Sequence, residues 1–242
     1  MPSSNPVMPA APGTHPGECE FPLSHGQRAL WFLQQLAPNS GAYNVPRAVY
    51  IPADHDLDIP ALRRTFQRLV DRHEPLRTLF PAPGGEPVQR VLPAMEVSFE
   101  EIDARSWDEA ELRRRLSAEA YRPFALDREP LMRVRLYARA SGGHVLFLNL
   151  HHMVSDLWSQ ALIMHEVGVH YGTETGRAPG RPLPLPLPYS SYVTEQRRRL
   201  AGPEGEDLWE FWRRQLAGEL PALNQPTDHP RPPRQSFRGA TQ

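Results

Sequence analysis

The sequence predicts an α/β fold: a single αβ-sandwich lobe in which a mixed β-sheet is flanked by helices. Strand-like runs alternate along the chain with segments of helical periodicity, which is typical of layered α/β folds. The run "GHVLFLNL" at 143–150 is apolar on both faces, as expected of a strand in the middle of a sheet covered on both sides. With 242 residues, the chain can bury a sizeable core.

Six segments carry helical periodicity or helix-start signals. The second of these helices is expected to begin near Asp58, a preferred capping residue, with Pro60 in its first turn. Ser106 and Glu109 form a capping-box pattern that predicts the start of the third helix. The expected helices cover residues 24–36, 58–73, 106 onward, about 157–172, 189–201 and 205–217.

Strands are predicted in the intervening segments. "RAVYIP" at 47–52 and the alternating "LMRVRLYA" at 131–138 are typical strand sequences. The turn sequence "ASGG" is expected to join the strand at 131–138 to the strand at 143–150 as a hairpin. Further short strands are expected around 76–80, 86–92 and 96–101.

The two ends of the chain lack this periodicity. Residues 1–20 are rich in proline and small polar residues, so we expect a disordered leader that cannot bury enough apolar surface to fold. The stretch "APGRPLPLPLP" at 178–188 predicts a proline-stiffened connection. We assign 21–223 to the lobe and 224–242 to an extended tail.

Composition excludes several classes of function. A net charge of -1, from 27 basic and 28 acidic residues, predicts no general attraction to nucleic acid or to an anionic membrane. No apolar stretch approaches the roughly 20 residues of a membrane span and no signal peptide is recognisable, so we expect a cytoplasmic protein. The absence of lysine excludes Schiff-base chemistry. Cys19 is the only cysteine, which excludes an internal disulfide framework and a cysteine-rich metal site.

Two adjacent histidines, His151 and His152, end the predicted central strand, and Asp156 follows four residues after the second. Successive residues of a strand face opposite ways, so at most one of the histidines can face a given cavity. A histidine at the mouth of a buried strand suits proton abstraction near neutral pH. From these residues alone, a general base and a hydrogen-bonded turn at a strand end are both open interpretations.

Other patterns of metal binding and catalysis are absent. The histidines of "HEVGVH" at 165–170 are five residues apart, whereas a zinc-protease helix places them four apart on one face. The sequence contains no G-x-S-x-G nucleophile elbow and no G-x-x-x-x-G-K phosphate-binding loop. We therefore expect no bound metal and no bound cofactor.

Four further stretches are notable: "SHGQRALWFL" at 24–33, "DRHEPLRTLF" at 71–80, "HHMVSDLWS" at 151–159 and "YSSYV" at 189–193. Their order and approximate separation resemble those in the condensation domains of nonribosomal peptide synthetases. The two middle stretches are the most specific. The tail "QPTDHPRPPRQSFRGA" also resembles the passage out of the family's first lobe. The resemblance covers about residues 21–242, which correspond to the first half of such a domain.

The resemblance implies the N-terminal lobe of a fold similar to chloramphenicol acetyltransferase, in which two lobes form a V around a tunnel that holds the active histidine. The family joins an acyl or peptidyl thioester to an acceptor amine and forms an amide. Its substrates arrive on the phosphopantetheine arms of donor and acceptor carrier proteins. These carrier proteins and the missing second lobe are the expected partners. The closeness of the first motif to Met1 favours a starter domain or a donor supplied by a separate protein.

The resemblance also assigns roles to single residues. His152 is expected to orient or deprotonate the amine, with His151 as its supporting neighbour. Asp156 is expected to be structural, in a buried or half-buried pair with an arginine of the 72–77 stretch, Arg72 before Arg77. This pairing agrees with a physical argument, because an unpaired charge beside the base costs energy once it is desolvated.

Three residues around the histidine motif are expected to support the site. Ser155 and Trp158 are expected to take part in packing and in anchoring the loop. Leu157 stands where the family usually has glycine. We expect an ordinary backbone conformation there, with the side chain packed as the first apolar residue of a buried helix and narrowing the acceptor side of the tunnel.

Two alternatives to an amide-forming enzyme remain open. One is a carrier-protein docking or scaffold lobe without turnover, and the other is a relative that uses acyl-CoA and an alcohol to form an ester. The isolated half is expected to fold but not to turn over substrates, because their alignment requires the second lobe.

Overall fold

The computed structural model describes residues 18–177, 184, 187–221 and 226–230. Most of the expected leader, of the proline-rich connection and of the expected tail lies outside the described residues. The start of the lobe is corrected, because strand β1 (Cys19–Pro22) begins inside the segment assigned to the leader. Across the described segments, no helix is both long enough and apolar enough to span a bilayer.

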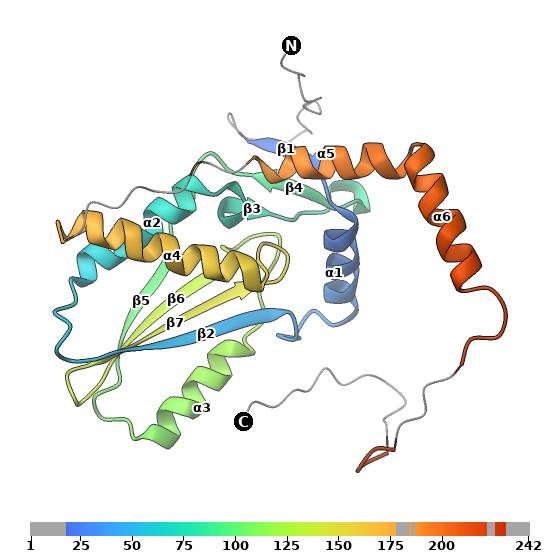
Figure 1. The fold of residues 1–242 in the computed structure, drawn as a ribbon. Coiled ribbons are helices and arrows are strands. Elements are labelled where there is room, and N and C mark those ends of the chain that lie inside the picture. The colour runs from blue at the N-terminus through green and yellow to red at the C-terminus, as the bar shows by residue number, and fades with distance from the viewer. Residues whose placement is uncertain (1–17, 178–183, 185–186, 222–225, 231–242) are drawn as a thin grey trace.

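The strands form two sheets where the sequence predicted one (Figure 1). In the larger sheet β7 (His144–His151) lies between β2 (Asn44–Ile51) and β6 (Met132–Ala138), with β5 (Ser98–Asp103) at the far edge. The predicted hairpin of β6 and β7 is confirmed, and β7 has a central position as expected. Only β5 and β6 form a parallel pair among the described strands, and parallel neighbours need a crossover, which α3 (Glu109–Ala120) supplies.

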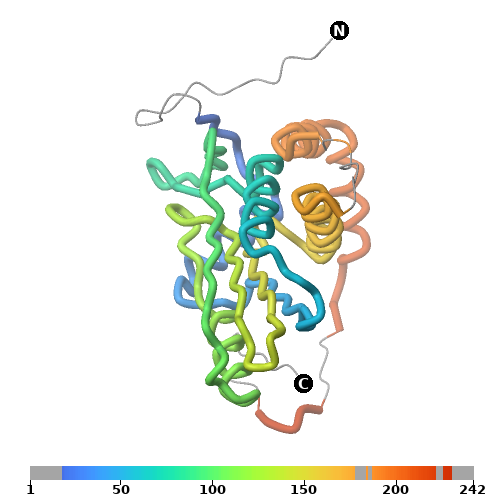
Figure 2. The backbone as a smooth tube through the Cα atoms, turned by 90° about the vertical axis from the view of Figure 1, so that its left-hand side faces the viewer, coloured from blue at the N-terminus to red at the C-terminus, as the bar shows by residue number. Residues whose placement is uncertain are grey.

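Helices cover both faces of this sheet. Helices α2 (Ile59–Arg72) and α4 (Leu157–Glu174) pack side by side on one face, and α3 covers the other (Figures 1 and 2). The apolar alternation of β7 matches this arrangement. Leu146, Leu148 and Leu150 join the core beneath α2 and α4, whereas Val145 and Phe147 join the cluster beneath α3.

The smaller sheet lies at the end of the larger one where β7 finishes. It consists of β1, β4 (Val88–Val91) and β3 (Thr78–Leu79), with the short helices η1 (Glu74–Arg77) and η2 (Pro83–Gly85) beside β3. Helices α1 (His25–Leu36) and α5 (Tyr189–Leu200) flank it (Figure 1). A separate apolar cluster joins this region to the loop after β7; its buried members are Leu23, Phe80, Phe124, Leu126, Leu131 and Met153.

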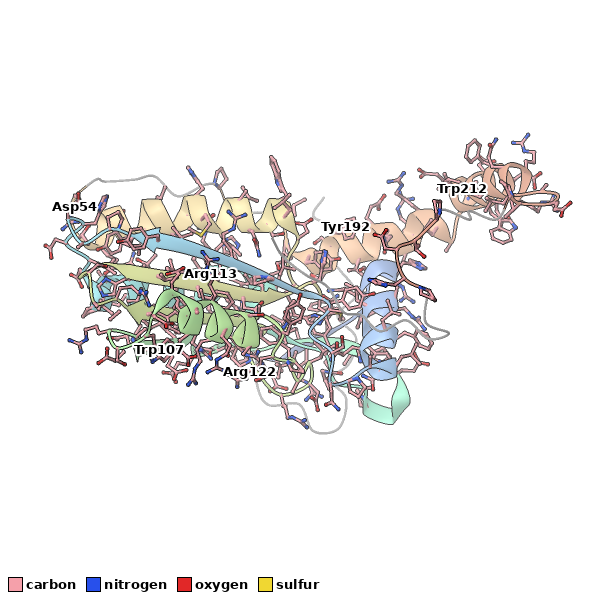
Figure 3. All side chains as sticks on the ribbon, turned by 90° about the horizontal axis from the view of Figure 1, so that it is seen from below. Asp54, Trp107, Arg113, Arg122, Tyr192 and Trp212 are labelled. Atoms are coloured by element: carbon pink, nitrogen blue, oxygen red, sulfur yellow. The ribbon has the colours of Figure 1, made fainter. Side chains whose placement is uncertain are left out.

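Helix α6 (Pro203–Gln215) extends away from both sheets and buries none of its residues (Figures 1 and 3). Its large apolar side chains are exposed, among them Trp209, Phe211 and Trp212. An amphipathic helix normally buries its apolar stripe. The side of α6 that carries these residues is therefore suited to a further packing partner.

The predicted helices are confirmed in position, with one correction at a helix start. The side chain of Asp108, and not that of Ser106, caps α3: its Oδ1 accepts a hydrogen bond of 2.7 Å from the backbone N–H of Glu111. Aspartate is among the strongest N-cap residues, so it can replace serine in this role two residues later in the chain.

We predict that Asp108→Ala lowers the free energy of unfolding by about 1 kcal/mol, because the helix loses its capping acceptor. Ser106→Ala is the matched control and should change stability by less than about 0.5 kcal/mol, as an exposed substitution does. Urea unfolding of both variants measures the difference. A larger loss of unfolding free energy for Ser106→Ala than for Asp108→Ala would instead support Ser106 as the capping residue predicted from the sequence.

Candidate functional site

The two histidines at the end of β7 lie in opposite environments, as strand geometry requires. His151 is 1% exposed, whereas His152 is exposed on the other side of the chain. The backbone N–H of His152 donates to the carbonyl of Tyr43 at 2.8 Å, which ties the strand end to the segment before β2. The expectation that only one of the pair faces a cavity is confirmed.

His151 is enclosed by the core. Its Nδ1 accepts a hydrogen bond of 3.1 Å from the backbone N–H of Met153. Its ring meets the ring of Phe124 edge-on at 6.0 Å, and the guanidinium of Arg133 lies 3.7 Å from the centroid of the same Phe124 ring. With Nδ1 as an acceptor, the hydrogen of the neutral histidine ring is on Nε2.

Burial lowers the pKa of His151 to about 4, and the charges of His152 and Arg133 act in the same direction. The ring is therefore neutral at neutral pH. It has no solvent-facing nitrogen, and its Nε2 has no hydrogen-bond partner within the described part of the chain. These properties fit a structural support and not the group that meets a substrate.

His152 faces a hollow of about 420 Å³. The hollow is bounded by the start of α1, by the loop 152–156, by the start of α4 and by α5. None of the described residues hydrogen-bonds the His152 imidazole, so both ring nitrogens are available to a ligand. A histidine with this freedom, on a backbone fixed by a central strand, can act as a general base.

Residues of two distant segments line the same hollow. Tyr189 and Tyr192 come from α5, and Ser24 caps α1. The hydroxyl of Tyr189 donates to Oγ of Ser24 at 3.1 Å, which joins the two helices across the hollow. None of these side chains was predicted as a site residue. The signal was present, because both segments belong to the four motifs that carry the resemblance.

Ser155 supports the loop as expected. Its side chain is buried, and its Oγ donates to the carbonyl of His151 at 3.4 Å. The backbone N–H of Val154 donates to the same carbonyl at 3.1 Å. The turn that follows the two histidines is thus closed back onto the end of β7.

Asp156 caps α4, and the structure does not pair it with Arg72. Its Oδ1 accepts hydrogen bonds from the backbone N–H and the Oγ of Ser159, each at 2.7 Å. These bonds are the main reason that the pKa of Asp156 is lowered, and the charge of His152 has a smaller effect in the same direction. The carboxylate is exposed, so it needs no buried counter-ion. The expected buried ion pair is therefore corrected to a helix cap.

Arg72 and Arg77 stabilise the end of α2 in other ways. Arg72 Nε lies 3.4 Å from the buried carboxylate of Glu166 on α4, which also contacts Nε2 of His73 at 2.6 Å. Arg77 donates to the carbonyl of Leu92. The first contact holds α2 to α4, and the second holds η1 to the residue that follows β4. Both support the lobe around the site.

The two residues after Asp156 differ from expectation in their exposure. Leu157 is the first residue of α4, so its helical backbone is as predicted, but its side chain is 73% exposed and not packed. Trp158 is 74% exposed and does not anchor the loop by burial. Both side chains project from the first turn of α4, where a further element of the protein could contact them.

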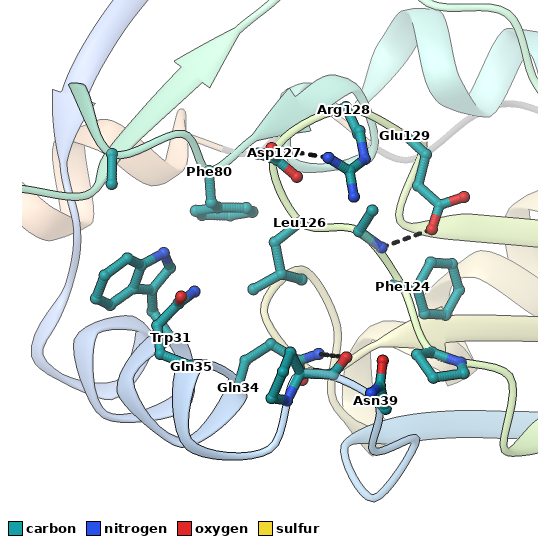
Figure 4. A pocket seen from close by; sticks show the side chains of 14 residues that line it. Trp31, Gln34, Gln35, Asn39, Phe80, Phe124, Leu126, Asp127, Arg128 and Glu129 are labelled. Carbon is teal, nitrogen blue, oxygen red and sulfur yellow. Dashed lines mark hydrogen bonds and ion pairs between the residues drawn. The ribbon is translucent and has the colours of Figure 1, made fainter. Parts of the chain in front are cut away.

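A second hollow of about 490 Å³ lies between α1 and residues 123–129 (Figure 4). Trp31, Phe80 and Leu126 contribute its apolar wall. His152 is not among its lining residues, so it is separate from the candidate site. Among the described residues, no cluster of three or more histidine, cysteine, aspartate or glutamate side chains could hold a metal ion.

We predict that His151 makes the protein less stable at acidic pH. The unfolded chain binds a proton near the ordinary pKa of 6.5, whereas the folded protein binds it only near 4. Stability is therefore full above pH 6.5 and decreases as the pH falls toward 4, by about 3 kcal/mol for this group. His170, whose pKa burial also lowers, contributes in the same direction.

The contribution of His151 is isolated by His151→Asn, which keeps an acceptor for the Met153 N–H but does not titrate. Urea unfolding at pH 7 and pH 4.5 should show a smaller pH dependence for this variant than for the original chain. Identical pH dependence in both proteins would mean that His151 is not held neutral in the folded state.

A double-mutant cycle distinguishes the observed partner of Arg72 from the one expected from the sequence. Arg72→Met and Glu166→Gln should show a coupling energy of about 1 kcal/mol or more, because they share a half-buried ion pair. Arg72→Met and Asp156→Asn should be additive within about 0.5 kcal/mol. A larger coupling for the second pair would contradict the assignment of Asp156 as a helix cap.

Comparison with known proteins agrees with this geometry. Residues 18–242 match the family profile described as "Condensation domain". A linear gramicidin synthase protein of Brevibacillus parabrevis is 40% identical over 242 residues, which are 98% of this chain and 3% of that protein. Phosphinothricin tripeptide synthetase PhsC of Streptomyces viridochromogenes is 36% identical over 99% of this chain and 22% of its own length.

A solved structure has the same fold. The X-domain from teicoplanin biosynthesis matches with a TM-score of 0.76 at 29% identity, over 90% of this chain and 48% of that chain. This chain therefore spans about half of the solved domain and a small part of the curated synthetases. The chain belongs to the condensation domain family of nonribosomal peptide synthetases and has the chloramphenicol acetyltransferase-like fold.

Proposed function

We propose that this chain provides the catalytic histidine of a domain that forms amide bonds between carrier-bound substrates. The observation that carries the proposal is the position of His152, whose ring is free of hydrogen-bond partners among the described residues and faces a hollow from the end of a central strand. His151 is the buried neutral support of this base.

In the proposed reaction, His152 orients the acceptor amine and accepts its proton as the nitrogen attacks the donor thioester carbonyl. The new C–N bond forms and the C–S bond breaks, so the donor phosphopantetheine leaves as a thiol and takes up the proton. The arms of the donor and acceptor carrier proteins deliver both substrates, and the domain itself holds no cofactor. The proposal includes a starter role, in which the donor acylates the first amino acid.

A second lobe is the remaining partner. We assign the residues from Cys19, where β1 begins, to position 223 to the first lobe and 224–242 to the passage toward the second. The coverage of about half of the solved X-domain supports this division, as does the exposed apolar side of α6. Leu157 and Trp158 would then face the second lobe across the hollow. We expect the isolated chain to bind carrier proteins without turnover, and the parent protein to act in the cytoplasm.

A docking lobe without turnover is the second candidate. One solved relative, 29% identical to this chain, is a complex of the X-domain with OxyB from teicoplanin biosynthesis. Members of this fold can therefore bind a protein partner, and carrier or partner binding without amide formation would assign this chain to that group. The free His152 favours catalysis over this alternative.

We predict that His152→Ala lowers the rate of amide formation by about 10² to 10⁴ in a protein that joins this chain to the other half of the domain. Single-turnover measurements with loaded carrier proteins give the rate. His165→Ala is a matched control, because His165 is also exposed but lies on α4 outside the hollow. Equal small effects of both substitutions, with carrier binding intact, would support the docking lobe instead.

A further inference from the structure

Gln27 on α1 is a buried amide that contacts the loop carrying His152. It is 5% exposed, although its helix lies at the edge of the lobe. A buried amide without hydrogen bonds costs free energy, so a buried glutamine usually has hydrogen-bond partners for its polar atoms. Both polar atoms of the Gln27 side chain have such partners.

The contacts of Gln27 join three separate segments. Its Nε2 donates to the backbone carbonyl of Met153 at 3.3 Å and to Oε1 of Gln89 on β4 at 3.1 Å. Its Oε1 accepts from the backbone N–H of Ser24 at 3.0 Å, as part of the capping box of α1. Gln89 in turn donates to the carbonyl of Pro22 at 2.8 Å. The amide is thereby fixed to the smaller sheet on one side and to the histidine loop on the other.

Met153 is the residue through which this contact reaches the base. Its N–H is bound to Nδ1 of His151, its side chain is buried in the apolar cluster, and its carbonyl accepts from Gln27. His152 stands between His151 and Met153, so its backbone is held by contacts of both neighbours. The ring of His152 has no hydrogen bond of its own among the described residues, and its placement therefore depends on these backbone anchors.

We propose that Gln27 is a positioning residue for His152: its hydrogen bond to the Met153 carbonyl fixes the loop that aims the imidazole into the hollow. The inference rests on the proposed function of His152 and extends it to a side chain on α1. Gln27 does not touch the reacting atoms, and its effect on the reaction passes through the loop. Small misplacement of a base is sufficient to slow a reaction that depends on alignment.

The chain offers a matched control in Gln34. This residue lies two turns later on the same helix, is also 5% exposed, and donates through Nε2 to a backbone carbonyl, that of Pro38, at 3.1 Å (Figure 4). Within the described structure, Gln34 makes no hydrogen bond to the histidine loop. Gln27→Met and Gln34→Met each remove a buried amide from the same helix. The first removes three side-chain hydrogen bonds and the second removes one, and only the first releases the loop.

The test measures single-turnover amide formation in a protein that contains both halves of the domain. Gln27→Met should lower the rate constant about tenfold, the effect of one hydrogen bond, with the KM for the acceptor carrier unchanged within about twofold. Gln34→Met should keep the rate within about twofold, with a smaller loss of melting temperature because it removes fewer hydrogen bonds. A rate that falls in both variants in proportion to their loss of melting temperature would overturn the proposal.

Gln27→Glu separates the loop contact from the helix cap. Glutamate retains the capping box, because its carboxylate still accepts from the Ser24 N–H, but the ionised group cannot donate to the Met153 carbonyl. The rate should fall as for Gln27→Met, and the deficit relative to the original protein should shrink at lower pH, where a protonated carboxyl can donate again. A normal rate at every pH would overturn the proposal.

His152→Ala in the same protein distinguishes failure of this inference from failure of the proposed function. Loss of turnover in His152→Ala with full activity in both Gln27 variants would retain His152 as the base and reject the positioning role. Full turnover in His152→Ala would reject both. As a readout independent of turnover, the ¹³C-labelled imidazole signal of His152 should broaden in Gln27→Met and remain unchanged in Gln34→Met.

Discussion

The alternation of side chains at the end of strand β7 is the constraint on which the site depends. The last residue of a central strand and the residue after it face opposite ways, and here His151 enters the core while His152 faces the hollow. Strand β7 is hydrogen-bonded to β2 and to β6, and the backbone N–H of His152 donates to the carbonyl of Tyr43, which holds the chain just beyond the strand. The proposed role of His152 therefore depends on the same geometry that buries His151.

The surroundings of each histidine fit its role. Around His151, the guanidinium of Arg133 lies over the ring of Phe124 and donates to the carbonyls of Arg122 and Pro123. These contacts hold the segment after α3 in place, and its Phe124 ring packs edge-on against His151. This cationic and apolar environment keeps the buried ring neutral. Beside the strand end, α1, α5 and the start of α4 bound the hollow. The exposed side chains of Leu157 and Trp158 on the first turn of α4 agree with the proposed second lobe.

Much of this arrangement could be predicted from the sequence, because it depends on local patterns. The two-sided apolar run of 143–150 indicated a central strand, and helix periodicity located α2, α4 and α5. The second sheet was not predicted, since Cys19–Pro22 is a short strand next to a proline-rich segment and pairs with β4 far along the chain. The histidine pair pointed to the candidate site, and strand geometry alone predicted that its two members face different surroundings.

Long-range pairing and burial could not be predicted in the same way. The partner of Arg72 depends on how α2 packs against α4, and the cap position of Asp156 satisfies its carboxylate locally. The exposure of Leu157, Trp158 and the apolar residues of α6 depends on neighbours that the sequence pattern does not reveal. The buried amide of Gln27 was overlooked because a glutamine in an amphipathic helix usually faces solvent. Only its hydrogen bond to the carbonyl of Met153 shows its connection to the histidine loop.

The most direct test of the catalytic role of His152 is a crystal structure of the complete domain with a carrier-bound acceptor analogue. We predict that the amine nitrogen lies about 3 Å from a ring nitrogen of His152, within hydrogen-bond reach of a general base. His151 should remain buried, with its Nδ1 bound to the Met153 N–H. An amine held by other groups, out of hydrogen-bond reach of His152, would contradict the central claim that the exposed histidine directly after β7 is the catalytic one.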